Sequence, residues 1–244
     1  MNNTNGYIDI HAHILPGVDD GSDSMEETLR MLQIALEQGI QTIIATPHFM
    51  AGEKNPSVEQ LLNIRDKVQM EADKLNKGLK LLLGNELFYT ESIVHALKSK
   101  QALTMAGSKY VLVEFAVRES YETVFRGMGE LIRAGYAPIL AHVERYLCLH
   151  KREDLISELV KLGCYIQMNS SSLMGGLFNT EAVLNRKLIN QGLVHFVGSD
   201  CHDEKVRIPN MNSAAKALHK KCEVELVNKI FLDNPINILE NTYL

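Results

Sequence analysis

The chain has 244 residues, of which 45% are hydrophobic and 23% are charged, with a formal net charge of −5 and a pI near 6.0. The length and composition are those of a globular protein, and we expect residues 1–244 to form a single domain. The acidic balance argues against a nucleic-acid-binding function, which requires a basic surface.

The chain has no features that predict export or membrane insertion. Its polar first residues are not followed by the apolar region of a secretion signal, and no apolar run reaches the ~20 residues of a membrane helix. The four cysteines, Cys148, Cys164, Cys201 and Cys222, are scattered without a paired spacing, which is typical of reduced thiols. We therefore expect a cytoplasmic protein.

Short apolar runs alternate with amphipathic helices along the chain. Strands are predicted over residues 7–10, 42–46, 79–83, 110–113, 137–141, 164–168 and 193–197. Helices are predicted over residues 24–38, 57–77, 92–98, 121–134, 152–162, 180–190, 212–220 and 223–232. Ser24 with Glu27, and Ser57 with Gln60, have the spacing of a capping box at a helix start.

This alternation predicts an α/β fold with a parallel sheet that is buried on both faces. A glycine-rich dinucleotide fingerprint is missing after the first strand, where a nucleotide-binding open sheet would need it. We therefore expect a closed or nearly closed, TIM-like (β/α)7 barrel with seven parallel strands. A doubly wound open sheet is the alternative.

Histidines and carboxylates follow the predicted strands with unusual regularity. His11 and His13 end the first strand, and residues i and i+2 of a strand point to the same face. The other candidates are Asp20 in the first loop and six residues at later strand ends: His48, Glu86, Glu114, His142, Asp200 and His202. In a parallel barrel these strand ends meet at one mouth.

Nine such side chains could bind two or three metal ions that share a bridging carboxylate. Imidazole and carboxylate ligands together suit Mn, Fe or Zn better than an ion that binds only oxygen. Any one of these residues, taken alone, could be a polar strand cap or an ordinary solvated side chain. The set as a whole favours a polynuclear metal site.

The motifs of the chain resemble those of the PHP (polymerase and histidinol phosphatase) superfamily. Within it, they are most similar to the CpsB/CapC type of bacterial protein tyrosine phosphatase. The resemblance covers essentially the whole chain and is carried, in order, by His11-Ala12-His13, Asp20, Thr46-Pro47-His48, Gly84-Asn85-Glu86, Val113-Glu114-Phe115, His142-Val143-Glu144-Arg145-Tyr146 and Ser199-Asp200-Cys201-His202.

The resemblance implies a distorted seven-stranded barrel with up to three ions, most often manganese, although iron or zinc would also fit. It implies a first ion bound by His11, His13, Glu86 and Asp200. Glu86 would bridge to a second ion at Glu114 and His142, and Asp20, His48 and His202 would bind the third.

Two arginines match those that bind phosphate in this family, Arg145 and Arg207. A guanidinium suits a phosphate because it can donate to two oxygens at once. The alternative for each arginine is a surface salt bridge. The expected mechanism is attack of a metal-activated hydroxide on phosphorus, with the ions neutralising the phosphate oxygens.

Cys201 to Arg207 also fits Cys-x₅-Arg, the signature of cysteine-dependent tyrosine phosphatases. In such a loop, small residues expose backbone N–H groups to the phosphate. Here Asp203 and Glu204 lie inside the loop, and their charges would repel the substrate. We interpret the match as accidental. Cys201 also departs from the family, which more often has a small residue such as alanine there.

We therefore predict a metal-dependent protein tyrosine phosphatase. By resemblance, its partner would be the tyrosine-rich tail of a bacterial tyrosine kinase that controls capsule or exopolysaccharide synthesis. A small-molecule phosphatase of the histidinol-phosphate type is the first alternative. An amidohydrolase also begins with His-x-His, but no predicted strand here ends in the lysine that often bridges its metals. A non-catalytic regulatory domain is the alternative outside enzymes.

Overall fold

The computed structural model describes residues 6–75, 78–176 and 179–244. All strand pairs between its named strands are parallel, and the strands form two sheets with the orders β1-β2-β4 and β3-β5-β6-β7-β8-β9. The strands are β1 (Tyr7–Ala12), β2 (Ile40–Ala45), β3 (His48–Met50), β4 (Lys80–Leu83), β5 (Glu86–Phe88), β6 (Tyr110–Glu114), β7 (Ala137–Leu140), β8 (Tyr165–Asn169) and β9 (Phe196–Gly198).

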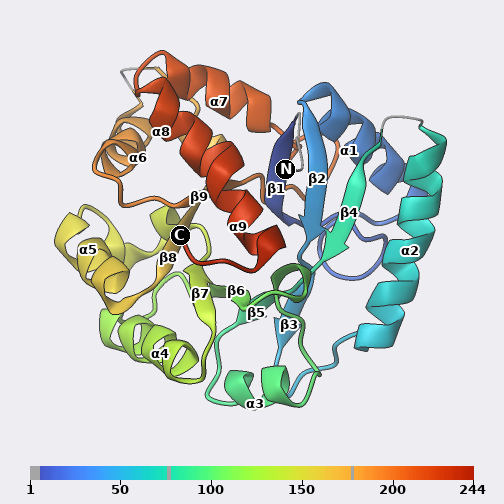
Figure 1. Ribbon diagram of the computed structural model, residues 1–244, viewed down its shortest axis with the longest axis horizontal. Helices are drawn as coiled ribbons and strands as arrows, with labels where there is room; N and C mark the ends of the chain where they lie inside the picture. Colours follow the sequence, from blue (N-terminus) through green and yellow to red (C-terminus); the bar gives the residue numbers. More distant parts are fainter. Residues whose placement is uncertain (1–5, 76–77, 177–178) are drawn as a thin grey trace.

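Helices surround the strands (Figure 1). They are α1 (Met25–Glu37), α2 (Val58–Lys74), α3 (Ile93–Lys98), α4 (Tyr121–Arg133), α5 (Glu153–Leu162), α6 (Thr180–Asn190), α7 (Met211–His219), α8 (Val224–Asn228) and α9 (Asn234–Glu240). Ser57 and Gln60 form the predicted reciprocal capping box at the start of α2. This helix ends at Lys74, and residues 76–77 of its predicted range lie outside the described residues. None of the described helices is both long and apolar enough to cross a membrane.

The predicted parallel α/β fold is confirmed, but the strands are not the seven uninterrupted ones that we expected. Thr46 and Pro47 separate β2 from β3, and Gly84 and Asn85 separate β4 from β5. Pro47 has no N–H group to donate to a ladder, so the first break follows from the sequence. The two ends of the strand order lie side by side, because Asp200 N donates to His11 O at 2.8 Å.

The C-terminal helical region extends beyond the predicted end at residue 232. It continues from α8 through a π-helical turn, Lys229–Asp233, into α9 and reaches Glu240. Pro235 lies in the first turn of α9, where a missing N–H group is tolerated. The wide turn before it allows the chain to stay helical.

Two apolar clusters fill the molecule. The larger cluster packs the strands against the surrounding helices. The smaller one lies among the strands and includes Ile8, Ile10, Tyr110, Phe196 and, from α9, Ile238. The Tyr110 hydroxyl, near the start of β6, donates to Thr242 O just beyond α9 at 2.7 Å. The helix therefore covers the end of the molecule where the strands begin, and it crosses in front of them in Figure 1.

Candidate metal centre

A β-bulge in β1 turns the two N-terminal histidines toward the centre. Asp9 pairs with Ile43 and Ala12 pairs with Ala45, so β1 uses one residue more than β2 over this stretch. An extra residue reverses the alternation of side chains beyond it. Ile10 accordingly belongs to the inner apolar cluster and Ala12 to the outer one, while His11 and His13 face the centre.

Two further site residues have backbone conformations that side chains other than glycine rarely adopt. His142 has φ 33° and Asp200 has φ 52°, and each is the second residue after the end of a strand. Such a conformation costs on the order of 1 kcal/mol or more. Hydrogen bonds hold both residues in place: His142 N donates to Gln167 Oε1 at 2.7 Å, and Asp200 N donates to His11 O at 2.8 Å.

The structure brings all nine predicted site residues together, with Glu86 in the middle. Glu86 Oε2 lies 3.2 Å from His11 Nε2, 3.1 Å from His13 Nε2 and 3.2 Å from His48 Nδ1. Its other oxygen, Oε1, lies 2.8 Å from His142 Nε2. Asp20 Oδ1 lies 3.2 Å from His48 Nε2 and 3.5 Å from His202 Nε2. One carboxylate therefore contacts four histidines.

The possible ligand atoms fall into three overlapping groups, each within 4.8 Å, as a shared metal would require. The groups are His11 with His13 and Asp200, His48 with Glu86 and Glu114, and His13 with Asp20, His48 and His202. His48 spans two groups because its Nδ1 faces Glu86 and Glu114 while its Nε2 faces Asp20. His142 Nε2 lies 3.6 Å from Glu114 Oε2. How the ions are shared among these residues stays a prediction.

Buried carboxylates give this cluster a strong preference for positive charge. Burial alone would lower the pKa of His13, but its hydrogen bonds to Asp19 and Glu86 outweigh burial and raise the pKa to about 10. The pKa of His142 is also raised to about 10, because hydrogen bonds to Glu114 and Glu86 outweigh its burial. Burial would raise the pKa of Glu86, but the neighbouring histidines hold it well below the usual range. The centre thus suits cations that compete with these protons.

Asp200 links the cluster of predicted metal ligands to the two arginines. Its Oδ1 lies 3.4 Å from His11 Nε2, while its Oδ2 lies 2.8 Å from Arg207 Nη2 and 3.5 Å from Arg145 Nη1. Both arginines are partly exposed and line a cavity of about 320 Å³ together with Asn169 and Val206. The guanidinium groups therefore lie at the open rim of the centre, where an anion can reach them.

Three residues that support the centre are missing from our sequence prediction. Asp19 Oδ2 lies 2.8 Å from His13 Nδ1 and accepts from His48 N at 3.1 Å. Gln167 Oε1 lies 3.3 Å from His11 Nδ1, and Asn169 Nδ2 donates to Asp200 Oδ2 at 2.7 Å. Gln167 and Asn169 alternate along the buried strand β8, and this pattern of polar residues was the available signal.

The loop from Cys201 to Arg207 is not an anion cradle. Cys201 is completely buried, and burial raises the pKa of its thiol well above the usual value. The Asp203 carboxylate already accepts the N–H groups of Lys205, Val206 and Arg207. The loop amides that would surround a phosphate in a cysteine phosphatase are thus bonded to a carboxylate. The geometry supports our interpretation of the Cys-x₅-Arg match as accidental.

The sequence of the chain matches a known protein family over nearly its whole length. The family model described as "Capsular polysaccharide synthesis, CpsB/CapC" matches residues 7–240. The chain belongs to the CpsB/CapC family. The resemblance seen in the sequence motifs is therefore confirmed over nearly the whole chain.

Proteins named tyrosine-protein phosphatases in other bacteria align with most of the chain. Tyrosine-protein phosphatase CpsB of Streptococcus agalactiae is 34% identical over 242 residues, covering 97% of this chain and 100% of the relative. Tyrosine-protein phosphatase YwqE of Bacillus subtilis is 32% identical over 219 residues, covering 90% of this chain and 86% of the relative. A crystal structure from a study of B. subtilis YwqE and Streptococcus pneumoniae CpsB, described as metal-dependent tyrosine phosphatases, superposes with a TM-score of 0.90. That chain is 31% identical, with 97% of this chain and 96% of the other covered.

More distant structures share only the fold. The phosphotriesterase homology protein of Escherichia coli superposes with a TM-score of 0.62 at 12% identity, covering 97% of this chain and 99% of the other. A TatD family hydrolase of Entamoeba histolytica superposes with a TM-score of 0.58 at 15% identity, covering 97% of this chain and 99% of the other. The CpsB/CapC chain thus has the architecture of TIM-barrel-like hydrolases.

Proposed function

We propose that this chain is a metal-dependent protein tyrosine phosphatase and that residues 1–244 form one catalytic domain. The observation that carries the proposal is the convergence of nine histidine and carboxylate side chains around Glu86, next to two partly exposed arginines. Its CpsB and YwqE relatives, which are named tyrosine-protein phosphatases, align over nearly their whole length and support the same conclusion.

The donor set fits divalent transition-metal ions. Five imidazoles and four carboxylates suit Mn²⁺, with Fe or Zn as alternatives, and can bind up to three ions. When bound, the ions supply a water of lowered pKa for attack on phosphorus and positive charge for the phosphate oxygens. The ligands are His11, His13, Asp20, His48, Glu86, Glu114, His142, Asp200 and His202. Asp19 and Gln167 orient the rings of His13 and His11 through their second nitrogens.

The two arginines bind the phosphate of the substrate. Arg145 and Arg207 share Asp200 Oδ2 in this structure, and both face the cavity at the rim. A phosphate has several oxygens, so that each guanidinium can donate to two of them. In this structure the two arginines share a single carboxylate oxygen instead. Val206 also lines this cavity and is 84% exposed, so it provides an apolar surface for a phenyl ring.

The proposed substrate is a phosphotyrosine protein, namely the tyrosine-rich tail of a bacterial tyrosine kinase that controls capsule or exopolysaccharide synthesis. The support comes from the family description and from the names of the relatives. We propose a cytoplasmic location, for which the four free cysteines are the support. We also propose that the two sheets act as one distorted seven-stranded barrel, with β2–β3 and β4–β5 each counting as one strand.

Kinetics on two substrates test the function. The metal-stripped protein is assayed with a phosphotyrosine peptide and with histidinol phosphate, before and after addition of Mn²⁺, Fe²⁺ or Zn²⁺. We expect no activity without metal and a preference for the phosphotyrosine peptide after Mn²⁺ is added. A higher kcat/KM for histidinol phosphate would overturn the assignment to tyrosine phosphatases, and hydrolysis of neither substrate would overturn the phosphatase function.

A further inference from the structure

A groove of about 680 Å³ lies between the first loop and the beginning of α2. One side is formed by Gly17 and Val18, and the other by residues 54–56 and the α2 residues Gln60, Asn63, Ile64 and Lys67. Val18 and Ile64 provide apolar surface, and the Asn63 side chain provides an amide. A mixed surface of this kind is suited to a peptide rather than to a purely apolar ligand.

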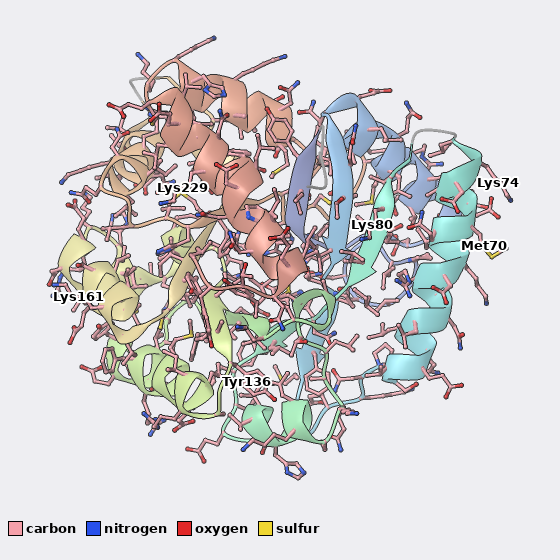
Figure 2. All side chains as sticks on the ribbon, viewed as in Figure 1. Met70, Lys74, Lys80, Tyr136, Lys161 and Lys229 are labelled. Carbon is pink, nitrogen blue, oxygen red and sulfur yellow. The ribbon has the colours of Figure 1, made fainter. Side chains whose placement is uncertain are left out.

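The charge of the groove is positive, unlike that of the whole chain. Lys54 and Lys67 line it, and no acidic residue of the described segments lies among the lining residues. Neither lysine forms a salt bridge within the described part of the chain, whereas Lys74 at the other end of α2 pairs with Glu71 at 2.6 Å. Figure 2 shows Lys74 and Met70 on that distal part of the helix. Two lysines without carboxylate partners can therefore bind anionic groups.

Hydrogen bonds fix the walls of the groove in advance. Asn55 accepts from Met50 N at 3.0 Å and donates to Met50 O at 2.8 Å, which fastens the 54–56 segment to β3. The capping box of Ser57 and Gln60 fixes the start of α2. A groove that is formed before binding costs less entropy to fill than one that must be ordered by its ligand.

The first loop connects one wall of the groove to the metal centre. Val18 is followed by Asp19 and Asp20; Asp19 holds His13 and His48, and Asp20 contacts His48 and His202. Asp20 is 64% exposed, so the centre opens on this side. A peptide whose phosphotyrosine occupies the centre can therefore extend from Asp20 into the groove.

We propose that this groove binds the acidic residues that flank the phosphotyrosine of the substrate, with Lys54 and Lys67 contacting their carboxylate or phosphate groups. The proposal rests on the tyrosine phosphatase function above and adds a specificity site to it. The occupant is an extended acidic segment of the substrate chain. Neighbouring phosphotyrosines and glutamates would supply the same negative charge.

The test compares three substrates of one enzyme. The first is a phosphotyrosine peptide with glutamates on both sides, the second is the same peptide with glutamines instead, and the third is p-nitrophenyl phosphate, which has no flanks. The variant Lys54→Ala/Lys67→Ala removes both charges. The control Lys80→Ala/Lys161→Ala removes two exposed lysines elsewhere; Figure 2 places Lys161 on α5, on the opposite side of the molecule from α2.

We expect the groove variant to lose roughly three- to tenfold in kcat/KM on the acidic peptide, because exposed ion pairs each contribute modestly. The loss should lie in KM and should shrink at high salt. Activity on the neutral peptide and on p-nitrophenyl phosphate should stay within about twofold of wild type, and the control should resemble wild type throughout. Lys54→Glu/Lys67→Glu should reduce activity on the acidic peptide further.

Two results would overturn the proposal: an unchanged kcat/KM of both groove variants on the acidic peptide, or an equal loss on all three substrates. The latter would mean that the substitutions disturb the metal centre instead. Failure of the tyrosine phosphatase function is a separate result, because the wild-type enzyme would then hydrolyse neither phosphotyrosine peptide.

Discussion

Gly198 of β9 lies directly against His11 of β1, so that a Cβ at residue 198 would come within 2.7 Å of the Cβ of His11. It would also come within 3.2 Å of Gln167 Nε2. Because His11 and Gln167 both belong to the centre, neither can move away without disturbing it. The glycine is required here for close approach, not for its backbone angle.

Gly198→Ala should therefore lower metal content and phosphatase activity. We expect a fall in kcat of at least about tenfold, since small displacements of a catalytic group have large effects. Metal content by mass spectrometry and steady-state kinetics measure both changes. Gly176→Ala is the matched control, because no atom of the described residues lies within 4 Å of a Cβ at that position. Normal metal content in Gly198→Ala would show that His11 tolerates the added methyl group.

Glu86→Ala should remove more metal than Asp20→Ala. Glu86 contacts His11, His13, His48 and His142, whereas Asp20 lies at the exposed edge of the cluster. A central ligand supports more than one ion and a peripheral one supports a single ion. Inductively coupled plasma mass spectrometry of the two variants, purified side by side, gives the stoichiometry. A full complement of metal in Glu86→Ala would refute a bridging role.

Arg145→Lys should weaken phosphate recognition while the metals stay bound. Lysine keeps the charge but loses the planar fork that contacts two phosphate oxygens at once. We expect kcat/KM to fall about ten- to a hundredfold, equivalent to roughly 1.4–2.7 kcal/mol of transition-state binding. Arg152→Lys is the control, because Arg152 forms an exposed pair with Asp154. A lowered Tm with unchanged kcat/KM would instead indicate that Arg145 is only a structural salt-bridge partner.

His195, outside the metal centre, should make stability depend on pH. Burial, with a smaller effect of Lys229, lowers its pKa from 6.5 to about 4, and its Nδ1 accepts from Ile166 N at 3.1 Å. Between pH 6.5 and about pH 4, His195 binds a proton in the unfolded chain but not in the folded chain. Stability therefore decreases as the pH falls from 6.5 toward 4, by about 2 kcal/mol at pH 4.5 from this one group.

The measurement is urea unfolding of metal-free protein at pH 7 and pH 4.5. Between pH 7 and pH 4.5, the free energy of unfolding of His195→Asn should decrease by about 2 kcal/mol less than that of wild type. The asparagine amide oxygen can accept from Ile166 N, and the amide does not titrate in this range. His95→Asn, at an exposed position, should behave as wild type. An identical loss in wild type and His195→Asn would contradict the prediction.

Much of the centre could be predicted from the sequence because its residues follow buried strands. The parallel arrangement alone places His48, Glu86 and Glu114 at one end of the molecule. The conformations that aim the other side chains are less visible. The bulge in β1 and the positive φ of His142 and Asp200 arise from tertiary hydrogen bonds, and no local pattern specifies them.

Other features depended on contacts between distant segments. Asn169 is an ordinary polar strand residue until β9 brings Asp200 within 2.7 Å of it. Met105 lies against Gly84, the residue after β4, and its Sδ would lie 3.0 Å from a Cβ at that position. The helical region beyond residue 232 was not predicted, because the π-helical turn Lys229–Asp233 has no distinctive sequence signal.

The central claim is that metal ions, and not the Cys201 thiol, drive hydrolysis of phosphotyrosine. The most direct test compares wild-type and Cys201→Ser proteins on one phosphotyrosine peptide, each stripped of metal and then reloaded, with metal content determined on the same samples. We predict that both stripped proteins are inactive and that both recover most of their activity in step with bound metal. Full activity of stripped wild type, or complete inactivity of reloaded Cys201→Ser with normal metal content, would contradict the claim.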